Sequence, residues 1–215
     1  GAAPVQNVGA YGQEIVQVLD SVLAYDLKEE KYVTIKAEDM KLGYRSSIFN
    51  HGEDAGRYLI ISMTIHLSHD TLTPPFYTSL QNYVEEHQIT DFSPKSIREM
   101  VTEIRWSKLP KPEEMASSGS FFKNVYLDDA EADRLRGMNV PVWEGNKVPS
   151  GWLIDHAGLK GMVFHGMRVS EKAALILINE SAQSYAHLKQ AREEIVSIIE
   201  KKYGLTLQQE PVELE

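Results

Sequence analysis

The chain of 215 residues contains no cysteine. It therefore has no disulfide bond, no thiolate that could bind a metal and no cysteine nucleophile. No apolar run approaches the roughly 18 residues that a membrane-spanning helix needs. Residues 1–25 also lack the basic start, apolar stretch and cleavage site of a secretory signal. We expect a cytoplasmic protein that does not span a membrane.

Clusters of positive charge are missing as well. The net charge is −9, from 31 acidic and 22 basic residues, and no five Lys or Arg residues lie together. Because a nucleic-acid-binding protein needs a basic surface to neutralise phosphates, we do not expect a nucleic acid partner. The hydrophobic share of 42% and the charged share of 25% are ordinary for a soluble globular protein of one large or two small domains.

Several common catalytic motifs are absent. The sequence contains no G-x-S-x-G, no G-x-x-x-x-G-K-[ST], no G-x-G-x-x-G and no H-E-x-x-H, which argues against a generic serine hydrolase, a P-loop enzyme and a zincin. His66 and His69 are three residues apart in a predicted strand, so their side chains would point to opposite faces. We expect no metal site there.

The first hundred residues show strand patterns followed by a helical one. Runs 15–25 and 32–35 flank a charged stretch at 26–31, which predicts a hairpin. Apolar residues then alternate with more polar ones, which predicts a strand with one strongly apolar face. The apolar positions are Leu59, Ile61, Met63, Ile65 and Leu67.

A helix is predicted from Ser93, a capping residue, and Pro94, which suits the first helical position, to about residue 106. The stretch KLPKP at 108–112 cannot continue a helix, because proline lacks the amide donor. We expect a domain boundary there.

The second half mixes both kinds of element. We predict an acidic helix over 128–136, a strand over 173–178 buried on both faces, and a long helix over 184–203 that Gly204 ends. The helix has an apolar stripe. Its members are Leu188, Ala191, Ile195, Ile198 and Ile199. Residues 205–215 then form a separate tail, and the fold class is α+β.

Two segments carry polar groups beside glycines. In GSFFKN, residues 119–124, a hydroxyl, an ammonium and an amide flank two aromatic residues. Taken alone, the segment reads as a loop entering a strand, with Phe121 or Phe122 in the core. SGWLID at 150–155, followed by GLKG at 158–161, reads alone as a helix packed through Trp152 and Leu153.

Taken together, five segments resemble the UDP-N-acetylenolpyruvoylglucosamine reductases, also called UDP-N-acetylmuramate dehydrogenases, over the length of the chain. They are GAAPVQNVGAYG at 1–12, GYRSSIF at 43–49, GSFFKN, SGWLID with GLKG, and LIN at 177–179. The resemblance implies the remainder of a two-subdomain flavin-binding domain of the vanillyl-alcohol-oxidase type over residues 1–109. A substrate-binding α+β domain follows over 110–204, and the tail 205–215 returns to the active site.

The resemblance implies a reaction and three catalytic residues. The family uses FAD and NADPH to reduce the enolpyruvyl ether of a UDP-sugar to UDP-N-acetylmuramate for bacterial peptidoglycan. Ser120 falls at the proton donor, Arg45 at the residue that stabilises the enolate, and Glu210 at the C-terminal glutamate that completes the set. Taken alone, Arg45 reads as a surface charge. Pro211 after the glutamate departs from the family pattern, as do two other residues. These are Ser46 and Val125.

Four further positions match substrate contacts in the family. Lys108 falls at the lysine that meets the diphosphate, and Asn124 and Lys160 fall at other substrate-contacting positions. Tyr77, in the proline-rich stretch 73–80, corresponds to the tyrosine of the loop over the substrate. Taken alone, these residues read as ordinary polar surface groups.

The cofactor site implied by the resemblance involves the first residues of the chain. Glycines there let the backbone approach a cofactor closely. The positions are Gly1, Ala2, Ala3, Gln6, Asn7, Gly9 and Arg45. In the family the flavin domain begins further upstream with a phosphate loop. We therefore expect the C-terminal portion of such an enzyme, with the N-terminal segment as its partner. The alternative is a catalytically silent nucleotide-sugar binding module with the same fold.

Overall fold

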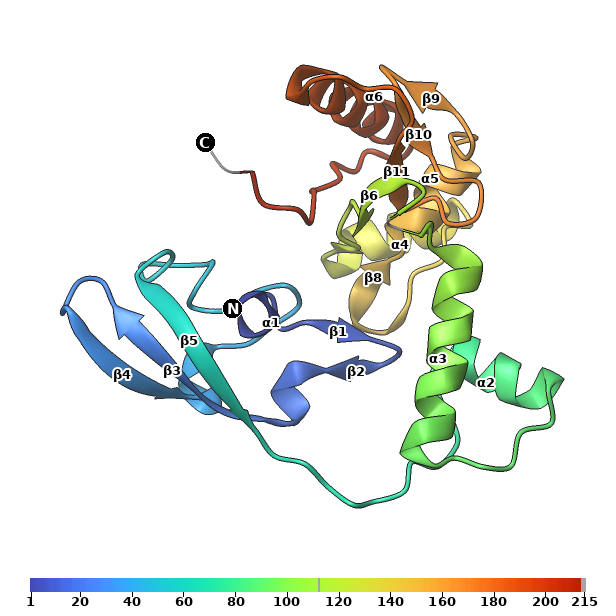
Figure 1. The fold of residues 1–215 in the computed structure, drawn as a ribbon. Coiled ribbons are helices and arrows are strands. Elements are labelled where there is room, and N and C mark those ends of the chain that lie inside the picture. The colour runs from blue at the N-terminus through green and yellow to red at the C-terminus, as the bar shows by residue number, and fades with distance from the viewer. Residues whose placement is uncertain (112, 214–215) are drawn as a thin grey trace. The chain divides into compact units, whose positions relative to one another are not determined.

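The computed structural model describes residues 1–111 and 113–213, which form two compact units. Unit 1 comprises Gly1–Ile104 and unit 2 Arg105–Glu215, so the division lies inside a helix. Each unit mixes helices and strands (Figure 1), and each is described by itself. The predicted mixture of helices and strands is therefore confirmed.

The sheet of unit 1 has three antiparallel strands in the order β4-β3-β5. The strands are β3 (Leu19–Asp26), β4 (Lys31–Lys36) and β5 (Tyr58–Ile65). Asp26 opposes Lys31 where β3 turns into β4, so the predicted hairpin is confirmed. The first predicted run begins with a short 3-10 helix, η1 (Ile15–Gln17), rather than a strand. A second 3-10 helix, η2 (Ala37–Met40), follows the hairpin.

Strand β5 forms as predicted, but it does not have a single apolar face. Met63 lies opposite Val22, whereas Ile60 lies opposite Ala24, so the register shifts by one residue between them. Such a bulge moves the following side chains to the other face of a sheet. Tyr58 and Ile60 pack on the cluster formed by Leu19, Val22, Met40 and Phe49. The more apolar set, Leu59, Ile61, Met63 and Ile65, is exposed by 40–58%.

Short elements and a helix pair complete unit 1. The helical turn α1 (Ala2–Val5) leads into the hairpin of β1 (Gly9–Ala10) and β2 (Gln13–Glu14). Helices α2 (Thr78–Glu86) and α3 (Pro94–Lys108) pack through Leu80, Val84, Met100 and Ile104. The hydroxyl of Ser93 accepts a hydrogen bond from the Ser96 amide at 3.3 Å, which confirms the predicted cap.

The sheet of unit 2 has four antiparallel strands in the order β6-β11-β10-β9. They are β6 (Ala116–Ser120), β9 (Val163–Phe164), β10 (Met167–Val169) and β11 (Ile176–Asn179). The predicted strand at 173–178 begins only at Ile176, because a turn precedes it in which the Ile176 amide bonds the Ala173 carbonyl. Ile176 and Leu177 are both buried in this interior strand, so burial on both faces is confirmed for its first half.

Three helices pack in unit 2. They are α4 (Asp129–Gly137), α5 (Ser150–His156) and α6 (Tyr185–Tyr203). Helix α6 buries Ala191, Ile195 and Ile199 and ends at Gly204 with φ of 71°, as the stripe and the glycine predicted. Strand β7 (Val125–Tyr126) precedes α4 and pairs with β8 (Lys147–Val148). Strand β8 and the 3-10 turn η3 (Glu144–Asn146) lie between α4 and α5 in the sequence.

Candidate active site

In unit 1, Asn7 joins segments that are far apart in the sequence. Its side chain is fully buried. The amide nitrogen donates to the Glu14 carboxylate at 2.8 Å and to the Gly43 carbonyl at 3.2 Å, and the amide oxygen accepts from the Val16 amide at 3.2 Å. These bonds occupy both donors and the acceptor of the side chain. Asn7 therefore holds residues 1–12 against the turn that contains Arg45.

Arg45 lies in a tight turn in which the amide and carbonyl groups of Gly43 and Ser46 bond each other. Its φ of 54° is in the left-handed region, which is uncommon outside glycine. The guanidinium donates to the Gly9 carbonyl at 3.2 Å and lies 5.1 Å from the centre of the Tyr44 ring. The structure thus brings the predicted Arg45 to the predicted cofactor segment, which contains Gly9.

Tyr77, the predicted loop tyrosine, precedes α2 and packs against the hairpin of the first segment. Its ring meets the edge of Tyr11 with centroids 6.0 Å apart. A side chain at Gly12 would also approach Tyr77 to 3.7 Å. Tyr77 stays 47% exposed, so it lies at the surface beside residues 9–14.

In unit 2, Ser120 is the last residue of β6 and is exposed. The next two residues fix its position, because Phe121 and Phe122 are 4% and 1% exposed and meet edge to face. The Phe121 amide donates to the Leu175 carbonyl at 2.7 Å. The core reading of the two phenylalanines is confirmed, and it leaves the hydroxyl of Ser120 at the surface of a rigid strand end.

The segments GSFFKN and SGWLID meet at Ser150. Its hydroxyl donates to the Lys123 carbonyl at 2.6 Å, and its amide donates to the side-chain oxygen of Asn124 at 3.1 Å. Ser150 is completely buried and begins α5. The helix predicted for SGWLID is confirmed, and Asn124 has a bond that links the two segments.

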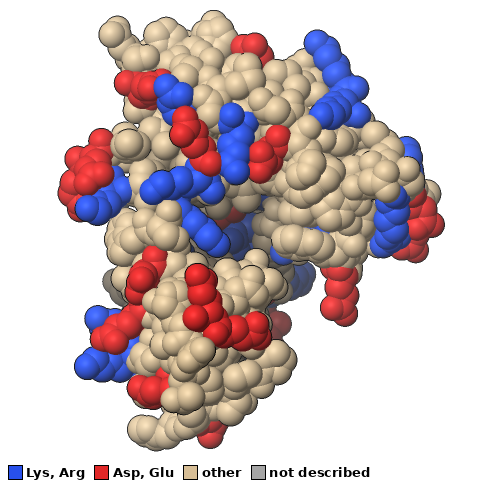
Figure 2. Space-filling model, turned by 90° about the vertical axis from the view of Figure 1, so that its right-hand side faces the viewer, with Lys and Arg blue, Asp and Glu red and all other residues tan. Residues whose placement is uncertain are grey.

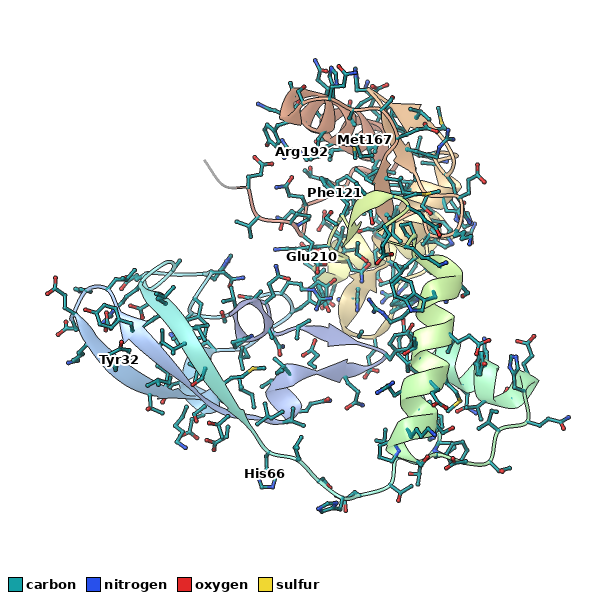
Figure 3. All side chains as sticks on the ribbon, viewed as in Figure 1. Tyr32, His66, Phe121, Met167, Arg192 and Glu210 are labelled. Carbon is teal, nitrogen blue, oxygen red and sulfur yellow. The ribbon has the colours of Figure 1, made fainter. Side chains whose placement is uncertain are left out.

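The tail runs antiparallel along GSFFKN. The Lys123 amide donates to the Gln208 carbonyl at 2.8 Å, Phe122 bridges to Gln209, and the Glu210 amide donates to the Phe121 carbonyl at 2.8 Å. The backbone of Glu210 therefore lies beside the residue that follows Ser120. Figure 3 labels Phe121 and Glu210. The structure brings together two of the predicted catalytic residues within one unit.

The two predicted substrate lysines have different settings. Lys108 ends α3 and lines a cavity of about 570 Å³ together with Arg168, Lys172 and Asn179. Lys160 forms an ion pair with Asp155 at 3.2 Å. On the face drawn in Figure 2, acidic and basic side chains are interspersed.

Sequence reasoning missed a polar cluster that contacts the tail. Arg192 of α6 donates to the Gln209 side chain at 2.5 Å and to the Glu213 carboxylate. A hydrogen bond from the Tyr185 hydroxyl to Glu213 raises the pKa of Tyr185 and lowers that of Glu213. The sequence signal that could have indicated this cluster is the position of Arg192, which lies at helical spacing from the stripe residues Leu188 and Ile195.

Neither a metal centre nor a membrane span is found in the part of the chain that the structure describes. Over residues 1–111 and 113–213, no three His, Asp or Glu side chains are placed to hold a metal ion. No helix within these ranges is long and apolar enough to cross a membrane.

The sequence of the chain is similar to that of one group of known proteins. Residues 111–214, nearly all of unit 2, match the family model described as UDP-N-acetylenolpyruvoylglucosamine reductase, C-terminal domain. The chain is also similar to a UDP-N-acetylenolpyruvoylglucosamine reductase of Ralstonia nicotianae, at 36% identity over 99% of the chain and 64% of the relative. The Idiomarina loihiensis reductase is 35% identical over 98% of the chain and 63% of the relative.

A solved structure shows the fold. The crystal structure of UDP-N-acetylenolpyruvylglucosamine reductase from Thermus caldophilus matches with a TM-score of 0.57 at 18% identity, covering 98% of this chain and 58% of that one. The chain is a mixed helix-and-strand protein that shares its fold with this structure. Residues 111–214 carry the C-terminal domain of the UDP-N-acetylenolpyruvoylglucosamine reductase family, and nearly the whole chain is similar to its members, which confirms the resemblance seen in the sequence. The chain spans less than two thirds of the length of these relatives.

Proposed function

We propose that the chain carries the catalytic residues for reducing UDP-N-acetylenolpyruvoylglucosamine to UDP-N-acetylmuramate, with FAD as cofactor and NADPH as hydride donor. The observation that best supports this proposal is the pairing of the tail with GSFFKN. Through it Glu210, far away in the sequence, bonds the residue next to Ser120. The bond between Arg45 and the Gly9 carbonyl adds support from unit 1.

The reaction assigns a distinct task to each catalytic residue. Hydride adds to the terminal carbon of a double bond conjugated to a carboxylate, so negative charge develops on that carboxylate. Arg45 stabilises this charge, because a planar guanidinium can bond both oxygens of a carboxylate. Ser120 then gives its proton to the adjacent carbon. Glu210, held next to Ser120 by the bond of its amide to Phe121, completes the catalytic set.

Four side chains bind the substrate in this proposal. Lys108 binds the diphosphate. The cavity of unit 2 that it lines holds further basic groups, Lys111, Arg168 and Lys172, together with acidic ones, Glu114, Glu171 and Glu180. Asn124 and Lys160 contact the sugar nucleotide, and Tyr77 covers it. The exposure of Tyr77 leaves its ring accessible to a ligand.

The residues of the first segment fit part of a flavin site. Residues 1–12 carry no charged side chain, and Asn7 and Arg45 fix their backbone through hydrogen bonds. A rigid uncharged surface with backbone polar groups suits a flat, partly apolar cofactor. The residues that would hold it are Gly1, Ala2, Ala3, Gln6, Gly9 and Arg45. Asn7, which is buried with its side-chain groups occupied, would act by fixing their backbone. A bound flavin would supply the hydride.

The domain assignment belongs to the same proposal. Residues 1–109 are part of a two-subdomain flavin-binding domain, 110–204 bind the substrate, and the tail 205–215 completes the site. Strand β5 pairs with β3 on one side and forms an edge of the described sheet, with exposed apolar side chains at Leu59 and Ile61. Such an edge is normally covered in a folded protein. We infer that a polypeptide segment corresponding to the unmatched length of the relatives covers it.

Ser120→Ala tests the catalytic assignment in the FAD-loaded protein. We expect NADPH to reduce the flavin at the unaltered rate, whereas oxidation of the reduced flavin by the enolpyruvyl substrate falls about 100-fold or more, because the proton donor is gone. Stopped-flow flavin absorbance follows both half-reactions. Ser117→Ala, a hydroxyl on the same exposed strand, is the matched control. An unaltered second half-reaction in Ser120→Ala would refute the proposal, and binding of the UDP-sugar without FAD would favour the silent binding module.

A further inference from the structure

We propose that Tyr185 and Arg192 of α6 are positioning residues that hold Glu210 beside Ser120. The proposal rests on the proposed function, in which Glu210 acts on the substrate. Neither residue is one of the predicted site residues. They hold the tail by bonds on either side of Glu210.

Arg192 contacts the tail on both sides of the proposed catalytic residue. Its guanidinium donates to Gln209, one residue before Glu210, and to Glu213, three residues after it. The Arg192 side chain is only 19% exposed, so these charge-assisted bonds are partly shielded from water. Figure 3 labels Arg192 on α6 and Glu210 on the tail.

Tyr185 adds a second contact to the same carboxylate. It lies seven residues before Arg192, and residues at this spacing lie along one side of a helix. Its hydroxyl donates to Glu213, which Arg192 also bonds. Two side chains of a helix anchored by Ile195 and Ile199 thus hold the tail at Glu213.

On its other side the tail pairs with GSFFKN through backbone hydrogen bonds. Glu210 bonds the Phe121 carbonyl through its amide, and this is the last such bond along the tail within the part of the chain that the structure describes. A cavity of about 470 Å³ lies between α6 and the tail, lined by Arg192, Val196, Leu207 and Gln209. Arg192 and Gln209, which bond each other, both line this space. We call the contacts of Arg192 and Tyr185 with the tail the clamp. Because a misplacement of a catalytic group by about 1 Å can lower the rate roughly 100-fold, the clamp should affect catalysis through the position of Glu210.

Hydrogen exchange at the Glu210 amide tests the clamp without any reaction. Arg192→Met keeps the aliphatic stem but removes the guanidinium, and we expect exchange of the Glu210 amide to accelerate about tenfold or more. Tyr185→Phe should give a smaller acceleration, and Arg192→Lys should restore part of the protection. Lys189→Met, at an exposed position on the same helix, is the control and should leave exchange unaltered. Unaltered exchange in Arg192→Met overturns the proposal.

The effect of the clamp on catalysis is measured with the same variants in the FAD-loaded protein. We expect Arg192→Met to slow oxidation of the reduced flavin by the substrate while flavin reduction and KM stay unaltered, with partial rescue in Arg192→Lys. Faster exchange without a slower oxidation would overturn the positioning role. If Ser120→Ala also leaves oxidation unaltered, the proposed function itself fails, and the exchange result then describes only the anchoring of the tail.

Discussion

The two units differ in how completely they bury their apolar side chains. Unit 2 has one large core in which α5, α6 and the four-stranded sheet meet, including Leu153, Ile195 and Leu207. Unit 1 has two small clusters, one under the β3–β5 sheet and one between α2 and α3. Large apolar side chains on β5 stay exposed. Unit 2 is thus built like a closed domain, whereas unit 1 presents a surface suited to being covered.

The difference indicates where the fold is self-sufficient. Burial of apolar area is the main stabilising contribution to folding, and in unit 2 even the tail contributes through Leu205 and Leu207, both 4% exposed. In unit 1 polar contacts are prominent, such as the buried Asn7 and the ion pair of Asp26 with Arg57. Substitutions in the two units should therefore have different effects.

The largest effect is expected in the core of unit 2. Ile195 is completely buried on α6, so Ile195→Ala removes apolar contacts and leaves a cavity. We expect the free energy of unfolding to fall by about 2–5 kcal/mol. Urea denaturation followed by circular dichroism measures it. If Ile195→Ala lowered the free energy of unfolding no more than the same substitution at an exposed isoleucine, the core of unit 2 would not be well packed.

Local sequence signals predicted much of the fold. The charged stretch between two apolar runs, the Ser93 cap and Gly204 after α6 act within a few residues, so the hairpin and both helices could be read directly. The bulge in β5 could not, because it depends on how the strand pairs with β3. The pattern of the isolated strand therefore pointed to the wrong distribution of its side chains.

The same distinction holds for the candidate site. Arg45, Ser120 and Glu210 were identified through motifs, which name residues without their contacts. The pairing of Glu210 with Phe121 spans nearly 90 positions in the sequence, and no local pattern indicates it. The bond of Asn7 to Gly43 spans 36 positions, and that of Arg192 to Gln209 in the tail spans 17. Such contacts arise only when the units fold.

A smaller effect is expected for the ion pair of unit 1. Asp26 is buried and bonds Arg57 at 2.6 Å, and this contact lowers the pKa of Asp26 to about 2. Asp26→Asn keeps an acceptor for the amides of Lys28 and Glu29, so we expect only a modest drop in the unfolding midpoint at neutral pH.

The pH dependence gives the sign of this effect. A carboxyl whose pKa is lowered in the folded state stabilises the fold above its unfolded pKa, near 3.8, and loses that contribution as the pH falls toward 2. The difference between the native protein and Asp26→Asn should therefore shrink as the pH falls from about 4 to about 2. Thermal unfolding across this range checks it, and a difference that stays constant with pH would argue against the ion pair.

The smallest effect on stability is expected for Ile61→Ala, which matches Ile195→Ala in chemistry but not in place. Ile61 is 52% exposed at the bulge of edge strand β5. Removing its side chain should change the free energy of unfolding by less than about 1 kcal/mol, because little buried area is lost. It should also reduce self-association, since β5 has no charged residue to prevent edge pairing. Light scattering at increasing concentration, beside the urea denaturation, measures both. A loss as large as that of Ile195→Ala would mean that β5 is covered in the chain itself, and the contrast between the units would disappear.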